Sequence, residues 1–210
     1  IYSNITKTIQ FLISANLAEI IAIFVATIAF PSFIFLNPVQ ILFVNLITDS
    51  FPAIALGLEP TESDIMSEKP RKNGTTVFGG GMGYMMAASG IIQAELILIG
   101  YTLGIKFFSA DVAMSIAFYS LNLIQFFYFA SMRVKRTAFK SNIFKNKWAV
   151  LAILFAVGLL AIIAFTPLHT FIGLTSLNLS QWLIVIGLSA LIFPITEIFK
   201  VLRNKTIKKD

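Results

Sequence analysis

The chain has 210 residues, of which 57% are hydrophobic and only 12% are charged. Soluble globular domains carry about 25% charged residues, so this composition excludes an ordinary soluble domain. The chain has no cysteine, which excludes disulfides and thiolate metal sites. Its net charge of +6 does not indicate nucleic acid, because basic residues concentrate in the cytoplasmic loops of membrane proteins. The composition therefore predicts an integral membrane protein that contacts the lipid bilayer and no nucleic acid.

Six apolar segments are each long enough for a helix to cross a bilayer, which takes about 20 residues. Transmembrane β-strands need only about 9 to 11 residues, so these lengths favour helices. We therefore predict an all-α, polytopic fold: a single transmembrane domain over residues 1–210 that forms a six-helix bundle. The predicted spans cover residues 8–30, 39–58, 82–103, 112–132, 148–165 and 181–200.

The basic residues predict the topology, because Lys and Arg mark cytoplasmic loops. All of the 16 Lys and Arg except Lys106 fall before the first span, after the last span, or in the loops that follow spans two and four. Both termini are then cytoplasmic, which agrees with an even number of spans. The first residue is Ile1 and no signal-peptide pattern precedes the first span, so we expect a segment of a longer protein.

The first span carries an amide and a carboxylate in the run SANLAEI, where Asn16 and Glu19 stand three residues apart. Residues at this spacing project from one face of a helix. Ionisable side chains inside a membrane are costly and are candidates for function. We therefore take Asn16 and Glu19 as one half of a candidate site.

The second span repeats this arrangement in the run FVNLITDSFPA, where Asn45, Thr48 and Asp49 share a face. Carboxylate, amide and hydroxyl oxygens suit a hard cation such as Ca²⁺, which takes six to eight oxygen ligands. No His or Cys accompanies them, which disfavours zinc and copper. The two stripes together predict an ion site between sequential helices.

Pro52 strengthens this prediction for the second span. Proline has no N–H, so the carbonyl of Thr48 loses its helical partner. Backbone oxygen is left unpaired at membrane depth only where it lines a cavity or meets an ion. We expect a broken helix at the site; the alternative is a proline kink whose polar residues bond across helices.

Three further features are weaker. The polar segment 59–80, with Lys69, Arg71 and Lys72, is either a solvated linker or a docking loop for a cytoplasmic partner. Glu95 in the third span is either a neutral, hydrogen-bonded glutamate or a functional one. Glu197 near the end of the sixth span is expected to snorkel to the interface or to pair with a neighbouring base such as Lys200.

The runs ISANLAEIIAIF and PVQILFVNLITDSFPAIALGLEP closely resemble the fifth and sixth transmembrane helices of the sarco/endoplasmic reticulum-type Ca²⁺-ATPases and their bacterial relatives. The run DIMSEKPRK is similar to the cytoplasmic loop that follows in that family, and LSQWLIVIGLSALIFPITEIFK is similar to its final helix. The resemblance covers the chain, strongly over residues 1–75 and weakly in spans three to five. It implies helices five to ten of a P-type ATPase.

This resemblance implies that Asn16, Glu19, Asn45, Thr48 and Asp49 coordinate calcium as the transported ion. Asn122 matches the position of a glutamate ligand in the eighth helix, and Gln125 is the neighbouring candidate. The sodium–potassium pumps have Asp where this chain has Asn45. Plasma-membrane-type calcium pumps lack the carboxylate that matches Glu19, so the reticulum type fits better.

Other parts of the family are absent from this chain. The Asp-Lys-Thr-Gly phosphorylation motif does not occur, so residues 1–210 alone are not expected to hydrolyse ATP. ATP and Mg²⁺ would act only through cytoplasmic domains outside the chain, and the partner would be the N-terminal half of the pump. The membrane is expected to be a bacterial plasma membrane. The alternatives are a pump for Mn²⁺, Na⁺ or H⁺, or an autonomous channel or secondary transporter.

Overall fold

The computed structural model describes residues 2–60, 82–133 and 146–207, with residues 202–207 as backbone only. Within these ranges the secondary structure is helical and no strand is present. Six helical spans are long and apolar enough to cross a membrane. They are α1 (Tyr2–Ala29), the composite α2–η1–α3 (Pro38–Gly57), α4 (Met82–Phe107), α5 (Ala110–Met132), α6 (Lys147–Phe165) and α8 (Leu179–Ile207). The prediction of an all-α, six-helix membrane bundle is confirmed.

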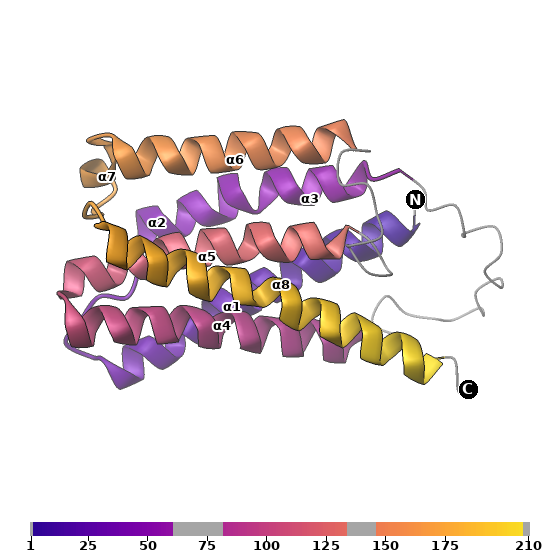
Figure 1. Cartoon of the computed structure of the whole chain (residues 1–210), viewed down its shortest axis with the longest axis horizontal. Coiled ribbons are helices and arrows are strands. Elements are labelled where there is room, and N and C mark those ends of the chain that lie inside the picture. Colours follow the sequence, from indigo (N-terminus) through magenta and orange to yellow (C-terminus); the bar gives the residue numbers. More distant parts are fainter. Residues whose placement is uncertain (1, 61–81, 134–145, 208–210) are drawn as a thin grey trace.

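The helices lie side by side along the long axis of the molecule (Figure 1). Neighbouring pairs follow the order α8, α5, α4, α1, α3 and α6 across the bundle. The short helix α7 (Leu168–Phe171) connects α6 to α8 at one end, and the start of α1 and the end of α8 lie at the other end (Figure 1).

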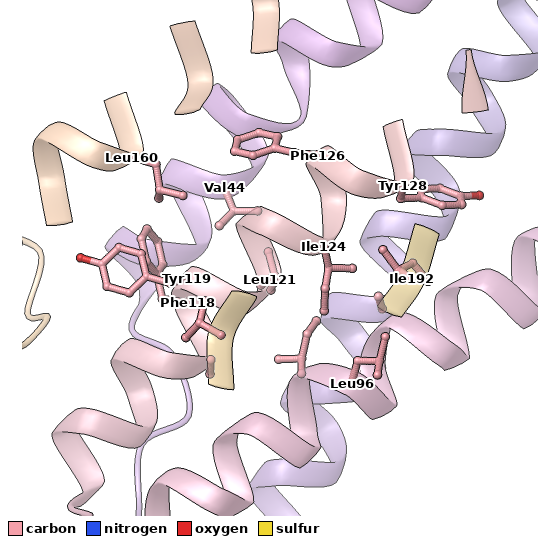
Figure 2. Packing of buried hydrophobic residues seen from close by; sticks show 14 of the residues in the cluster. Val44, Leu96, Phe118, Tyr119, Leu121, Ile124, Phe126, Tyr128, Leu160 and Ile192 are labelled. Atoms are coloured by element: carbon pink, nitrogen blue, oxygen red, sulfur yellow. The ribbon is translucent and has the colours of Figure 1, made fainter. Parts of the chain in front are cut away.

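Helix α5 forms the centre of the bundle and is buried along most of its length. Figure 2 shows side chains of α4, α6, α8 and the π turn gathered around it, with Leu121 and Ile124 in the middle. Both of these residues are at most 1% exposed. Small residues allow close approach, as at Gly104 of α4, where an added Cβ would lie 2.5 Å from the Cα of Ala113. Such small-residue contacts are typical of membrane helix interfaces.

The first span begins earlier than hydropathy predicts, at Tyr2 and not near residue 8. Its first turns contain polar side chains, but Thr6, Lys7 and Gln10 are buried against the rest of the bundle. Hydropathy marks where a helix can meet lipid, and it does not register polar turns that are covered by other helices.

The second span keeps a continuous helical path but changes its winding in the middle. Asn37 caps the first turn in a capping box with Gln40, and Pro38 follows as the first helical residue. Residues Val44–Thr48 (η1) then form a π-helical turn in which the N–H of Asp49 donates to the carbonyl of Val44 at 3.0 Å. α3 (Ser50–Gly57) continues the span. The interruption predicted near Pro52 thus takes the form of a π turn, a feature that is frequent at functional sites.

Candidate cation site

The two polar stripes of α1 and the second span meet in the structure. The side-chain amide of Asn45 donates a hydrogen bond of 3.0 Å to Oε2 of Glu19. The other carboxylate oxygen, Oε1 of Glu19, is buried and has no hydrogen-bond partner in the described part of the chain. Glu19 itself is only 5% exposed. A buried acceptor without a donor is costly, which makes this oxygen a candidate ligand.

Asp49 stands where the π turn passes into α3. Both of its carboxylate oxygens are buried and neither finds a donor among the described residues. α1, which carries Glu19, packs against α3, which begins directly after Asp49. The preceding residue is Thr48, whose hydroxyl donates to the carbonyl of Val44 at 2.8 Å, which leaves its lone pairs free to accept or to coordinate. Two buried acids on neighbouring helices are stabilised by a cation that binds both.

Asn16 is placed differently from the other four residues of this set. Its side chain is exposed on α1 and its amide donates back to the carbonyl of Leu12 at 2.9 Å. Glu19 is buried one turn away, so the two residues lie at the edge where the bundle meets its surroundings. No hydrogen bond joins Asn16 to Glu19, Asn45 or Asp49 in the described part of the chain, so its membership of the site stays a prediction.

Asn122 lies in the buried centre of α5. Its amide donates to the carbonyl of Phe118 at 2.7 Å, and its Oδ1 has no partner within the described ranges. One turn further, Oε1 of Gln125 is also buried and has no donor there. No hydrogen bond joins either residue to Glu19 or Asp49 in the described part of the chain. Asn122 and Gln125 thus offer neutral oxygen atoms, but their membership of the site remains a prediction.

The other acids of the spans do not join this group. Glu95 is exposed on the outer side of α4, whereas its neighbours Gln93 and Ala94 are buried. Glu197 is buried and pairs with Lys200 at 2.8 Å, so of the two expectations for it the ion pair is the one observed. The residues Lys69, Arg71 and Lys72 lie outside the described residues.

The donor set defines what the site can hold. It consists of two carboxylates and nearby amide and hydroxyl oxygens, the ligands that hard cations prefer. No cluster of three or more His, Cys, Asp or Glu that could hold a metal occurs in residues 2–60, 82–133 and 146–207. The set therefore fits a hard cation and falls short of a complete calcium shell on its own.

Known proteins share this chain's sequence over nearly its whole length. A family described as "Cation transporting ATPase, C-terminus" matches residues 33–202. The chain belongs to this family. Its helices are the C-terminal membrane part of a cation-transporting P-type ATPase, as the resemblance in the sequence predicted.

Three relatives illustrate the relationship of this ATPase segment to whole proteins. Calcium-transporting ATPase 1 of Bacillus cereus is 34% identical over 97% of this chain and 25% of its own length. A calcium-transporting ATPase of Listeria monocytogenes is 33% identical over 99% of this chain and 24% of its own length. An endoplasmic reticulum calcium ATPase of Aspergillus fumigatus is 28% identical over 95% of this chain and 24% of its own length. The chain thus spans about a quarter of the length of the curated relatives it matches.

Sequence reasoning missed one polar group at the end of the ATPase bundle. Arg133, at the end of α5, pairs with Glu59 at 3.1 Å, and Asn146 donates to the same carboxylate at 2.7 Å. From the sequence, Glu59 is assigned to a polar loop, and Arg133 serves only as one of the basic residues that mark a cytoplasmic loop. No local motif links the three. Glu59 is 74 residues from Arg133 and 87 residues from Asn146 in the sequence.

Proposed function

We propose that this chain is the ion-binding part of the membrane domain of an ATP-driven pump that transports calcium. The observation that carries the proposal is the pair of buried carboxylates, Glu19 and Asp49: Oε1 of Glu19 and both oxygens of Asp49 lack donors among the described residues, and Asn45 donates to Oε2 of Glu19 across two helices. An ion between them would satisfy these oxygens. The names of the relatives, which are calcium-transporting ATPases, support calcium over other cations.

In this proposal Asn16, Glu19, Asn45, Thr48, Asp49 and Asn122 supply ligands to the transported ion. Calcium takes six to eight oxygens, so the exposed position of Asn16 indicates that the site is completed by groups from outside residues 1–210. The π turn over Val44–Thr48 supports a functional role for this stretch, because such turns are frequent at functional sites. Residues 1–210 form a single membrane domain of the pump.

The rest of the pump would supply the chemistry. ATP and Mg²⁺ act at phosphorylation and nucleotide domains that this chain does not contain, and the N-terminal helices are its partners. Both termini are proposed to be cytoplasmic, since the basic residues gather at one end. Most of the relatives reported above come from bacteria, which supports a bacterial plasma membrane.

The test is cation-dependent phosphorylation of the full-length pump by ATP. Membranes that contain the pump are supplied with calcium, manganese or sodium at buffered concentrations, and the phosphoenzyme is measured. Calcium is expected to give the strongest stimulation. Asp49→Asn keeps the shape of the side chain but removes its charge, and it should lower apparent calcium affinity by about 100-fold or more, within the range for a buried charge left without its counterpart. Asp111→Asn, which changes an exposed acid at the far end of α5, is the matched control.

Stimulation by manganese or sodium and not by calcium would assign a different pump. Normal calcium affinity in Asp49→Asn would contradict the site.

A further inference from the structure

One end of the bundle holds a second buried polar group, which we call the loop-end cluster: Asn4, Lys7, Glu59, Arg133 and Asn146. These five residues come from α1, the end of α3, the end of α5 and the start of α6. Helix α3 separates Glu59 of this cluster from Asp49 of the candidate site.

The centre of the cluster is a two-pronged ion pair. Nε of Arg133 donates to Oε2 of Glu59 at 3.2 Å, and an Nη donates to Oε1 at 3.1 Å. The Arg133 side chain is 4% exposed and that of Glu59 is 11% exposed. Bidentate pairs of arginine and carboxylate fix orientation as well as distance, and burial protects them from screening. Lys7 adds a further link, because its ammonium donates to the Arg133 carbonyl at 2.7 Å.

Side chains of the cluster also donate hydrogen bonds to backbone carbonyl groups of α3 and of the residues that follow it. Asn146 donates to the carbonyl of Ala55 at 3.2 Å. Asn4 donates to the carbonyls of Gly57 at 3.2 Å and Glu59 at 2.6 Å. One turn closer to the site, Thr8 donates to the carbonyl of Ala53 at 3.2 Å. Side chains from α1 and from the cap of α6 therefore hold the backbone from Ala53 of α3 to Glu59, just beyond its end.

The second span is held differently on the two sides of Asp49. α3 is held by these bonds, and its first residue follows Asp49, whose own carbonyl accepts from the N–H of Ala53 at 3.1 Å. On the other side of Asp49 lies the π turn, where the winding is looser. α1 carries Asn4, Thr8 and Glu19, so the bonds from Asn4 and Thr8 link the segment after Asp49 to the helix that carries Glu19.

We propose that Glu59 and Arg133 are positioning residues for the cation site: they fix α3 against α5 and so hold Asp49 at the distance from Glu19 that an ion requires. This inference rests on the proposed function, since it assigns a role to the site described there. It goes beyond that function by naming residues that never touch the ion yet set its affinity.

The experiment uses the full-length pump in membranes or detergent. The variants are Glu59→Gln, Arg133→Gln and the exchange Glu59→Arg with Arg133→Glu, and Asp111→Asn is the control. Equilibrium binding of ⁴⁵Ca gives the affinity and the number of bound ions. Hydrogen–deuterium exchange over Ser50–Gly57, measured without metal, gives the anchoring of α3.

Each single variant is expected to increase exchange in α3 and to weaken calcium binding by about tenfold, in the range of coupling between groups of one network, with the number of ions unchanged. The exchange of charges should restore affinity to within about threefold of wild type, which loss of folding stability alone would not do. Increased exchange in α3 with unchanged affinity, or a charge exchange that folds but does not restore affinity, would overturn the proposal.

Asn146→Ser is a second test of the proposal, for use if the charge variants do not fold and cannot be purified. Serine preserves a capping oxygen for α6, where Asn146 now accepts from the N–H groups of Trp148 and Ala149, but it is too short to reach the carbonyl of Ala55. Affinity should fall by about threefold, and no change would count against the proposal. If the wild-type pump binds no calcium, the proposed function fails; the same series is then run with the cation that it does bind.

Discussion

The side-chain nitrogen of Asn45 lies 3.0 Å from Oε2 of Glu19, so the two helices of the candidate site already share a hydrogen bond. This contact has a consequence for ion binding. A cation is coordinated by oxygen, so under the proposed function the amide oxygen of Asn45 would face the ion, while its NH2 group is the donor to Glu19. Asn45 is therefore proposed to serve both the carboxylate and the ion.

The first prediction concerns these two roles of Asn45. Asn45→Ala removes both the proposed ion ligand and the bond that holds Glu19. Calcium affinity of the full-length pump should fall by about 10- to 100-fold, since bonds to charged groups contribute about 1.5–3 kcal/mol. Equilibrium ⁴⁵Ca binding measures it, with Thr102→Ala, at an exposed position of α4, as the control. An affinity equal to wild type would show that Asn45 does not take part in binding.

The sequence predicted the fold and selected the candidate site residues from local patterns. Long apolar runs specify membrane helices, and Asn45, Thr48 and Asp49 share a face by spacing alone. Resemblance to the calcium pumps added Asn122, which no periodicity could have selected in the buried polar stretch of α5.

Other features depend on packing and could not be read from one sequence. The second span has a π turn over Val44–Thr48 where the sequence predicted a break, and the residue types do not specify this winding. Glu95 and Gln93 are two residues apart in an apolar helix, and only the contacts of α4 decide which of them is buried. The bonds between Glu59, Arg133 and Asn146 join distant segments, so they appear only once the bundle is assembled.

The second prediction concerns the buried pair at the end of α8. Glu197 accepts from Lys200 at 2.8 Å and from the hydroxyl of Ser131 at 2.7 Å. Glu197→Gln removes the carboxylate that faces the Lys200 ammonium, and breaking a buried pair in this way costs about 3–5 kcal/mol. Thermal unfolding in detergent should show a clear drop in midpoint. The double variant Glu197→Leu with Lys200→Leu should be less destabilised than Glu197→Gln, because both charges of the pair are then removed together; the reverse order would argue against the pair.

A third prediction compares two glycines in apolar helices. An added Cβ at Gly104 would lie 2.5 Å from the Cα of Ala113, a backbone atom that cannot turn aside, whereas nothing lies within 4 Å of a Cβ at Gly158. Gly104→Ala should therefore force α4 and α5 apart and destabilise the fold by about 1–3 kcal/mol. Gly158→Ala should change stability by less than about 0.5 kcal/mol. Unfolding midpoints of the two variants, measured side by side, decide the matter, and equal midpoints would mean that the helices can separate without cost.

The last prediction is that the pump binds one calcium ion per cycle and not two. A divalent ion in a low-dielectric site needs about two carboxylates, since charge left uncompensated there costs several kcal/mol. Glu19 and Asp49 supply them, and Asn122 is neutral where a second ion would use an acid. Glu95 is exposed on α4 and no hydrogen bond joins it to Glu19 or Asp49 in the described part of the chain, so it is not expected to supply the missing charge. Equilibrium ⁴⁵Ca binding at saturation should give one ion per phosphorylation site, in wild type and in Glu95→Gln alike. Two high-affinity ions would refute this count, and a fall from two to one in Glu95→Gln would place Glu95 in the site after all.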